Sequence, residues 1–321
     1  MQHGAYTFPG QQRRNGRRRT LRHGRPLLQS STWLALGACA AGLMLFAHPG
    51  ASEDAGPQRV VSINMCADEL ALRLARPGTL QSVTWLARDA LGSNVSDLAR
   101  SVRVNYGAVE EVSAYAPDLV LAGRYTTRNT VALLKRLNVP VHELDAPTSV
   151  DGVRSQIMAV AAMLGQPDQG VRMVEAFDAR LPRLSGASGR LPTAVVLSAA
   201  GFTTGKGTLV DDILTHAGIK NLAASGPLRG YVQPPLELVA RARPDILIIN
   251  ADEQAPASLA HELLKHPALH ELGAEVRIVV LPTRLWTCAG PGVAEAIDRL
   301  AAEAGAWRSQ AAFRAAGGRK Q

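Results

Sequence analysis

The 321-residue chain lacks a strong net charge outside its first 51 residues. Its formal charge is +8, but seven of its arginines lie in residues 1–51, which contain no acidic side chain. The rest of the chain holds the other 28 of the 35 basic side chains and all 27 acidic ones, so its charges nearly balance. A nearly neutral body has none of the clustered positive charge by which proteins bind nucleic acids. The sequence therefore gives no reason to expect a nucleic-acid partner.

Long apolar runs are also missing, apart from one stretch at 33–47 that follows the arginine-rich segment. It falls short of the roughly 20 apolar residues that a transmembrane helix needs. A basic start, an apolar centre and small residues up to Ala51 are typical of a cleavable signal peptide. We expect residues 1–51 to be this signal and the mature protein to be periplasmic. Cys39 lies in a Leu-Gly-Ala-Cys sequence typical of lipoproteins, so lipid anchoring there is the alternative.

Cysteine is scarce, and export changes what the cysteines can do. Cys39 leaves with the expected signal, so Cys66 and Cys288 are the thiols of the mature chain. Two thiols in an oxidising compartment often pair. These two lie in opposite halves of the sequence, and spacing alone does not tell how close their Cα atoms come.

The most informative positive feature is a unit that occurs twice, at 110–121 and 237–248. Each copy opens with a Glu, has a Val two residues later and Pro-Asp after seven, and ends in an apolar run. The residue before a proline disfavours helix, so a helix should end there. The branched apolar run predicts a buried strand. A period of 127 residues is too long for a solenoid and indicates two similar α/β lobes.

The rest of the chain alternates strands and helices, which predicts mainly parallel sheets with helices on their faces. A strand-free helical region interrupts this alternation, with an apolar stripe at Val153, Ile157, Val160 and Leu164. We expect its second helix, 168–184, to join the lobes as a stiff connection. The expected parts are a first lobe at 57–148, the helical region at 149–189 and a second lobe at 190–315. The expected strands are 59–64, 82–85, 139–144, 193–198 and 277–281, and the other expected helices are 67–74, 128–137, 209–216, 257–264 and one from 292.

From Arg59 to about Leu300 the chain resembles the periplasmic substrate-binding proteins of ABC importers for metal chelates, that is, iron(III)–siderophore complexes and cobalamin. The resemblance implies two Rossmann-like lobes joined by one long rigid helix, with the ligand in the cleft between them. It also implies a monomer that delivers its chelate to a permease and its ATPase at the inner membrane, without catalysis and without a cofactor of its own. It rests on Arg-Val-Val-Ser-Ile-Asn at 59–64, the two repeated units, the Gly123 turn, Leu-Gly-Gln-Pro at 164–167, and the segments 202–206 and 217–222.

The resemblance implies that Glu110 and Glu237 dock into basic pockets of the permease. Two acids in equivalent positions suit a partner with two equivalent basic sites, because complementary charge fixes register and speeds encounter. The alternative is that each Glu only favours the dipole at the start of its helix. Glu111 has no counterpart in the second copy and is not expected to dock.

Candidate ligand contacts come from loops that follow strands, because open α/β sheets bind ligands at the carboxyl ends of their strands. Aromatic planes there would cover a bulky apolar ligand, and arginines would donate to its oxygens. Core packing is the alternative for each aromatic. Several arginines favour an anionic iron chelate, which we prefer at this stage, whereas paired tryptophans favour a corrinoid. The candidates are Trp85, Tyr106, Arg124, Tyr125, Phe202, Arg229, Tyr231, Arg284 and Trp286.

Cys66 follows the first strand and Cys288 follows the Trp286 loop, so a disulfide between them would join the lobes near the cleft. Ligation of the chelated metal by a thiol is the alternative. A receptor for bare zinc or manganese needs converging ligands. His142 and His216 are isolated, and the spacing of His261, His266 and His270 suits no single helical face. A tetrapyrrole chelatase-like enzyme would need a base in the cleft, and neither isolated histidine stands out.

Overall fold

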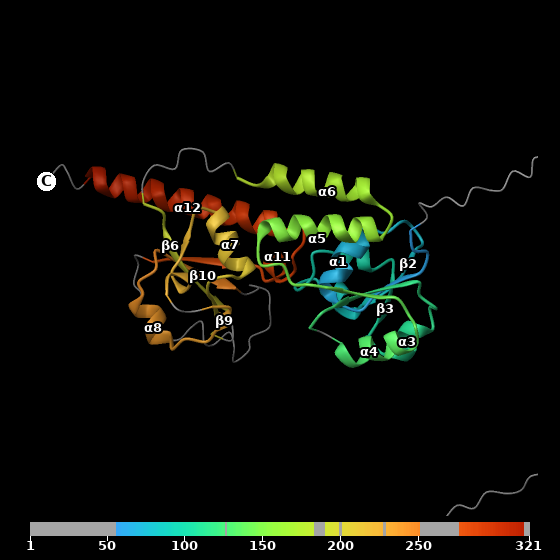
Figure 1. Ribbon diagram of the computed structural model, residues 1–321. Coiled ribbons are helices and arrows are strands. Elements are labelled where there is room, and N and C mark those ends of the chain that lie inside the picture. The colour runs from blue at the N-terminus through green and yellow to red at the C-terminus, as the bar shows by residue number, and fades with distance from the viewer. Residues whose placement is uncertain are drawn as a thin grey trace, which may run out of the picture. The chain divides into compact units, whose positions relative to one another are not determined.

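The computed structural model describes residues 56–125, 127–182, 190–198, 201–226, 229–250 and 276–317 (Figure 1). The chain divides into residues 1–51 and 52–321, and the second unit holds every described residue. The expected signal peptide, the loop after the joining helix and the helix at 257–264 lie outside the described ranges. Within them, no helix combines the length and the apolar character needed to cross a membrane.

The first lobe is built on a five-stranded sheet in the order β3-β2-β1-β4-β5, in which every pairing is parallel. Helix α1 covers one face of the sheet, and α3 and α4 cover the other. The elements are β1 (Val60–Ser62), α1 (Met65–Leu74), β2 (Leu80–Thr84), the 3₁₀ helix η1 (Trp85–Arg88), α2 (Ser96–Ala99), β3 (Arg103–Asn105), α3 (Val109–Ser113), β4 (Leu119–Gly123), α4 (Arg128–Arg136) and β5 (Val141–Leu144).

The second lobe repeats this arrangement. Its parallel sheet has the order β11-β10-β6-β8, which matches β5-β4-β1-β2 of the first lobe strand for strand. A two-stranded antiparallel sheet of β7 and β9 is added. The prediction of two similar, mainly parallel α/β lobes is confirmed. The elements are β6 (Thr193–Ser198), β7 (Thr203–Thr204), α7 (Leu209–His216), β8 (Lys220–Asn221), η2 (Ala223–Ser225), β9 (Tyr231–Val232), α8 (Leu236–Arg241), β10 (Ile246–Asn250), β11 (Arg277–Leu281), α11 (Arg284–Thr287) and α12 (Gly292–Gly317).

The repeated sequence unit corresponds to α3–β4 and α8–β10. In both copies the residue before the proline is left-handed, with φ of 44° at Ala116 and 41° at Arg243, so the helix ends as predicted. The aspartate of each Pro-Asp pair anchors the start of the neighbouring strand. Asp118 accepts hydrogen bonds from the backbone N–H groups of Gln58 and Arg59, and Asp245 accepts one from that of Thr193.

Two helices, α5 (Val150–Met163) and α6 (Pro167–Arg180), form the connection between the lobes and lie side by side (Figure 1). Ser149 caps α5, and the backbone N–H of Val150 donates to Asp212 of α7 in the second lobe. The predicted stripe of α5 is buried. Helix α6 ends at Arg180, four residues before the predicted end, because Leu181 turns to an extended conformation.

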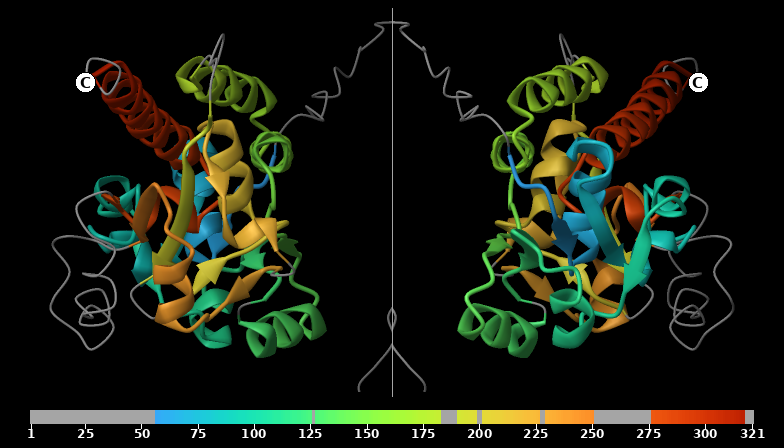
Figure 2. Two further views of the ribbon diagram at one scale, coloured as in Figure 1. Left: turned by 90° about the vertical axis from the view of Figure 1, so that its left-hand side faces the viewer. Right: turned by 90° about the vertical axis from the view of Figure 1, so that its right-hand side faces the viewer.

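A shared hydrophobic core joins the lobes on the side of α5 and α6. Side chains alternate along each strand, so Ala194 faces this core and Val195 faces the opposite side. The shared core takes side chains from α1, α5, α6, α7 and α12 as well as from strands of both sheets. Figure 2 shows these helices from both ends of the molecule. The two sheets are therefore packed against one continuous layer.

Candidate functional site

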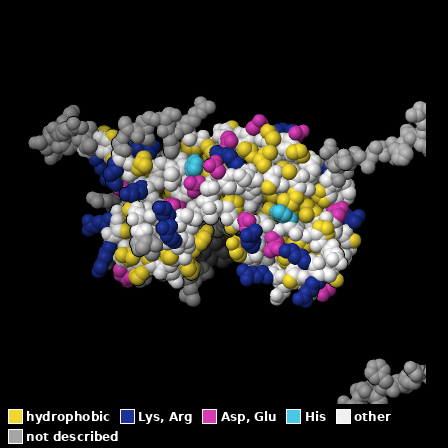
Figure 3. Space-filling model, in the orientation of Figure 1, with side chains coloured by type: hydrophobic (Ala, Val, Ile, Leu, Met, Phe, Trp, Pro, Cys, Tyr) yellow, Lys and Arg dark blue, Asp and Glu magenta, His cyan; other side chains and the backbone are white. Residues whose placement is uncertain are grey.

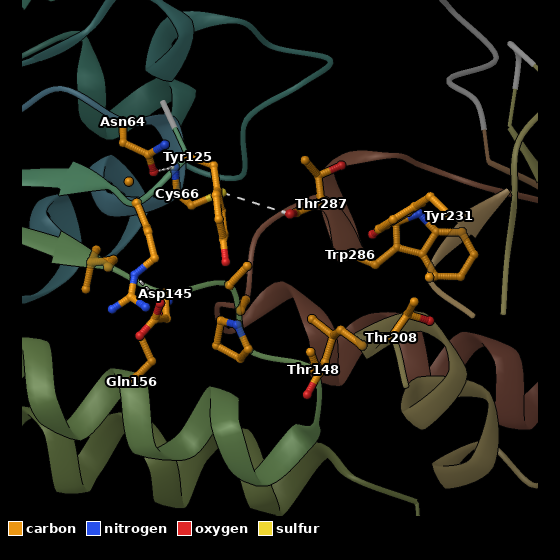
Figure 4. A pocket seen from close by; sticks show the side chains of 18 of the residues that line it. Asn64, Cys66, Tyr125, Asp145, Thr148, Gln156, Thr208, Tyr231, Trp286 and Thr287 are labelled. Atoms are coloured by element: carbon orange, nitrogen blue, oxygen red, sulfur yellow. Dashed lines mark hydrogen bonds and ion pairs between the residues drawn. The ribbon is translucent and has the colours of Figure 1, made fainter. Parts of the chain in front are cut away.

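A pocket of about 420 Å³ lies between the lobes, beneath α5. Figure 3 shows the surface hollowed between the two lobes, and Figure 4 shows the pocket from close by. Its size falls within the range of small-molecule sites, about 300–1,000 Å³. The residues that line it are Asn64, Cys66, Gly123, Arg124, Tyr125, Leu144, Asp145, Ala146, Pro147, Thr148, Gln156, Gly207, Thr208, Leu209, Gly230, Tyr231, Trp286, Thr287 and Ala289.

Most of the lining comes from segments that directly follow strands, as parallel sheets require. Asn64 follows β1, Arg124 follows β4 and Asp145 follows β5. Helix starts add two further positions. The Asn64 side chain caps α1 by accepting from the N–H groups of Cys66 and Ala67, and the Thr208 hydroxyl caps α7. Gly205 to Thr208 is thus a turn that leads into the start of α7.

Both lobes contribute an aromatic side chain to the pocket. Tyr125 of the first lobe and Tyr231 of the second are 67% and 70% exposed, so both rings can meet a ligand. Trp286 is only 4% exposed, and its indole N–H donates to Asn250 Oδ1 at 2.8 Å. This bond fixes the plane of the indole. The pocket therefore has one rigid aromatic wall and two accessible phenols.

The charges within the pocket cancel. Arg124 and Asp145 form an ion pair with 2.6 Å between Nε and Oδ1. They are the one cation and the one anion among the described residues that line the pocket. Arg284 does not line it, because its guanidinium donates to Asn94 Oδ1 at 2.9 Å. Arg229 is exposed on a short backbone bridge with Lys206 and is also absent from the lining.

The remaining aromatic candidates lie elsewhere on the surface. Trp85 and Tyr106 stack on each other in the first lobe, with ring centroids 6.3 Å apart and planes inclined by 29°. Phe202 is 42% exposed in the second lobe. None of the three lines this pocket. Four of the nine candidates, Arg124, Tyr125, Tyr231 and Trp286, are brought together, and ligand contact by the others stays a prediction.

The structure joins Cys66 and Cys288 in a disulfide, with their Cα atoms 5.0 Å apart. Cys66 stands in the first turn of α1 in the first lobe, and Cys288 directly follows α11 in the second. Cys66 also lines the pocket. The covalent link therefore crosses between the lobes at the edge of the ligand site.

The sequence analysis did not predict roles for Asn250, Asn94 or Asp145. Asn250 and Asn94 hold Trp286 and Arg284 in place by hydrogen bonds, and Asp145 balances the charge of Arg124. Asn250 and Asp145 stand at the end of a strand or one residue beyond it, the signal that selected the aromatics. They are neither aromatic nor basic, so they lack the side-chain chemistry that marked the other candidates. Asn94 lies in a loop of the first lobe, and nothing in its local sequence points to Arg284, 190 residues away.

The two proposed docking acids occupy equivalent places. Glu110 is exposed in the first turn of α3, and Glu237 is exposed in the first turn of α8. Within residues 52–321, α3 and α8 lie along the same lower side in Figure 1. Glu111 turns back instead, and its carboxylate accepts from the N–H groups of Tyr106 and Ala108. This local role agrees with its exclusion as a docking residue.

Two buried acids lie behind the pocket on α1. Burial raises the pKa of Asp68 to about 6, although hydrogen bonds from Ser62 and Thr84 oppose the shift. The Thr84 hydroxyl lies 2.5 Å from Asp68 Oδ2. Burial likewise raises the pKa of Glu69, against the opposing influence of Arg73. Neither acid lines the pocket, so both belong to the support of the site.

No group of three His, Cys, Asp or Glu side chains able to hold a metal ion occurs among the described residues. His142 is exposed on β5, and His216 is bonded to the backbone oxygen of Asp212. The remaining candidate ligands, His261, His266 and His270, lie outside the described residues.

The fold and the pocket are those of a two-lobed binding protein with space for a small molecule between its lobes. The family model described as "Periplasmic binding protein" matches residues 60–283. The chain therefore belongs to the periplasmic binding protein family, a family of substrate-binding proteins that act outside the cytoplasm.

Individual relatives agree with this assignment. A cobalamin-binding protein of Halobacterium salinarum is 27% identical over 210 residues, which cover 62% of this chain and 56% of the relative. The chain thus matches little more than half the length of that protein. A periplasmic haem-binding protein of Pseudomonas aeruginosa has a TM-score of 0.63 at 24% identity, over 77% of this chain and 92% of its own. A vitamin B12-binding protein of Vibrio cholerae has a TM-score of 0.60 at 18% identity, over 78% and 98%. At these identities the solved structures support the fold alone.

Proposed function

We propose that this chain is the substrate-binding component of an ABC importer for a metal chelate, and that its ligand is a corrinoid of the cobalamin type. The observation that carries the proposal is the pocket between the lobes, where Tyr125 and Tyr231 face the ligand space from opposite sides beside the indole of Trp286. Aromatic surfaces of this kind bind flat or bulky apolar ligands. The name of the Halobacterium relative supports the same ligand class.

The charge of the pocket is the reason to prefer a corrinoid over an anionic ferric siderophore. The earlier preference for an iron chelate depended on several arginines in the cleft. Arg124 is neutralised by Asp145, and Arg284 is bound to Asn94. An anionic chelate would meet an arginine whose charge is already balanced by a neighbouring carboxylate. A ligand of low net charge with a large apolar surface needs no unbalanced cation.

The two exposed acids support delivery to a permease. Glu110 and Glu237 offer one negative charge from each lobe, in equivalent helices. Such a pair fits two basic sites on a partner with twofold symmetry, and long-range attraction would speed the encounter. We therefore assign the partner as the permease of an importer, with its ATPase on the cytoplasmic side.

The test is a fluorescence titration of the mature protein with cobalamin, haem, a ferric hydroxamate, a ferric catecholate and free zinc, each in parallel. We expect saturable quenching by cobalamin at micromolar concentrations or below. Trp286→Phe should remove most of the quenching, because Trp286 is the tryptophan that lines the pocket. Trp307→Phe is the control, since that ring packs against Arg190 outside the pocket.

Affinity is tested with the two exposed tyrosines. Tyr125→Ala and Tyr231→Ala should each weaken cobalamin binding at least tenfold, about 1.4 kcal/mol. Phe313→Ala is the control, because this ring is 81% exposed on α12 and lies outside the pocket. Tight binding of a ferric siderophore without cobalamin would replace the corrinoid by the iron complex. Binding of free zinc alone would overturn the chelate class.

A further inference from the structure

One short segment of the second lobe, residues 284–290, is held by side chains of the first lobe. The backbone oxygen of Arg284 accepts a hydrogen bond of 2.7 Å from Asn94 Nδ2, and its guanidinium donates to Asn94 Oδ1. Cys288 is bonded to Cys66. Asn94 and Cys66 both belong to the first lobe. The segment is thus clamped at both ends, once by hydrogen bonds and once covalently.

A close approach without room for a side chain completes the clamp. A Cβ atom on Gly290 would lie 3.0 Å from the carboxyl carbon of Glu69, a first-lobe residue that is 3% exposed. Atoms this close must shift, and Glu69 has little space in which to move. Asn94 Nδ2 also lies 3.4 Å from Glu69 Oε2. The segment therefore fits against a buried polar cluster of the first lobe.

The clamped segment is also part of the ligand site. Trp286, Thr287 and Ala289 line the pocket, whereas Asn94 and Glu69 do not. Within the second lobe, the segment is tied to β10 by the hydrogen bond from Trp286 to Asn250. The indole therefore takes its position from contacts to both lobes. A change at Asn94 would move the aromatic wall without altering a residue of the pocket lining.

We infer that the Cys66–Cys288 disulfide is a positioning element of the ligand pocket, and that its reduction by a dithiol loosens segment 284–290 and weakens ligand binding. The part that concerns affinity rests on the proposed function. Cys66 lines the pocket, so a reductant can reach its sulfur from the ligand space. A bound ligand covers the same surface. Because coupling between two equilibria is reciprocal, the ligand should in turn protect the disulfide from reduction.

The chemical step is ordinary thiol–disulfide exchange. One thiolate of the dithiol attacks a sulfur of the protein disulfide, which breaks the Cys66–Cys288 bond and forms a mixed disulfide. The second thiolate of the reductant then displaces the protein sulfur and closes a cyclic disulfide. The protein gains two electrons and two protons as two thiols, and the reductant loses them.

The first test needs no ligand. Hydrogen exchange of peptides that cover residues 284–290 is compared between the oxidised mature protein, the same protein treated with dithiothreitol, and the Cys66→Ser/Cys288→Ser double variant. We expect hydrogen exchange in this segment to be at least tenfold faster in the two samples that lack the disulfide, while exchange in peptides from β6 and α7 stays unchanged. Equal exchange in all three samples would overturn the inference. If the double variant fails to fold, the reduced wild-type protein still decides.

The second test measures affinity for cobalamin by the titration described above, before and after treatment with dithiothreitol. A loss of at least tenfold is expected on reduction, together with slower reduction when cobalamin is bound. Equal affinity in both states would overturn the positioning role even if exchange had changed. Absence of cobalamin binding in the oxidised state would instead count against the proposed function, and the exchange experiment would then decide the inference by itself.

The noncovalent half of the clamp provides a specific control. Asn94→Ala removes the hydrogen bonds to Arg284 and leaves the disulfide in place. Its effect on exchange at 284–290 should be small in the oxidised protein and large after reduction, because the two attachments hold the same segment. Equal effects in both states would show that the attachments act independently and would contradict a shared clamp.

Discussion

Gly170 of α6 lies against Ala161 of α5 so closely that a methyl group on the glycine would stand 2.5 Å from the alanine Cβ. This contact lets the two connecting helices approach each other. Ala161 is fully buried and belongs to the core that both lobes share. The close packing of α6 on α5 therefore depends on the absence of a side chain at Gly170.

Gly170→Ala should destabilise the protein by about 1–3 kcal/mol, because overpacking forces neighbouring side chains and backbone to shift. Gly305→Ala in α12 is the matched control, since its new Cβ would meet only the end of Arg308 at 3.9 Å. Replacing that helical glycine should stabilise by up to about 1 kcal/mol. Denaturant unfolding measures both changes. A Gly170→Ala variant as stable as the parent would contradict the close packing of α5 on α6.

Asp68 should make the protein less stable as the pH rises from about 4 to 6. Its pKa is raised from 3.8 to about 6, so between these values the folded state binds more protons than the unfolded state. Stability then falls with rising pH and levels off above the folded pKa. A difference of about 2 pKa units corresponds to roughly 3 kcal/mol as an upper estimate.

Asp68→Asn tests this expectation, because the amide cannot ionise and its oxygen can still accept from the Thr84 N–H, which lies 3.1 Å from the carboxylate. We expect the variant to be more stable than the parent at pH 7.5 and to lose most of the slope between pH 4 and 6. Glu69, whose pKa is also raised, supplies the slope that remains. An unchanged slope would show that Asp68 is not the titrating group.

Asp245 should stabilise the second lobe with the opposite pH dependence. Burial acts to raise its pKa, but hydrogen bonds from Arg190 and Thr193 outweigh it and leave the pKa below its usual value. The contribution is present above the unfolded pKa of about 4 and is lost as the pH falls through the folded value. Asp245→Asn should cost about 1–3 kcal/mol at pH 7.

Thermal unfolding at pH 7 and pH 3 measures this prediction for Asp245→Asn. The difference between variant and parent should shrink at pH 3, because this pH lies below the unfolded pKa and part of the parent's advantage is lost there. Glu143→Gln is a suitable comparison, because that acid is paired with exposed Lys135 and should cost under about 1 kcal/mol. If Asp245→Asn lost the same stability at both pH values, the loss would come from altered packing and hydrogen bonding and not from the carboxylate charge.

Reversal of both proposed docking acids, Glu110→Arg with Glu237→Arg, should abolish uptake of the chelate and leave its binding unchanged. The reason is that like charges would then face each other across the interface with the permease. Uptake is measured in cells that carry the cognate importer, and binding is measured on the purified protein. Glu175→Arg is the control, since this acid is exposed on α6, and α6 lies on the side of the molecule away from α3 and α8 (Figure 1). Normal uptake by the double variant would refute the docking role.

Much of the fold could be predicted because the strands are branched apolar runs with clear ends. The strand at 193–198, the helix at 209–216 and the strand at 277–281 were predicted with the limits that the structure shows. The strands that were missed, β3, β7, β8 and β9, have only two or three residues each. A run that short contains too little alternation to be recognised.

The site was less predictable, because the direction of a side chain depends on partners far away in the sequence. The search for loops that follow strands selected Tyr125, Tyr231 and Trp286, and all three line the pocket, although Tyr231 itself begins β9. Their contact with a ligand stays a prediction. Position at a strand end could not tell that Arg284 would turn to Asn94 or that Arg124 would be neutralised by Asp145. These pairings leave the described lining of the pocket without a net charge.

The disulfide between Cys66 and Cys288 closes residues 66–288 into a covalent ring, because 222 positions separate the two cysteines. A single cut anywhere inside this ring would leave the pieces attached to each other. Protease-treated protein would then run as one band on a non-reducing gel and separate only after reduction. The ring also keeps both lobes on one molecule when the chain is opened within it.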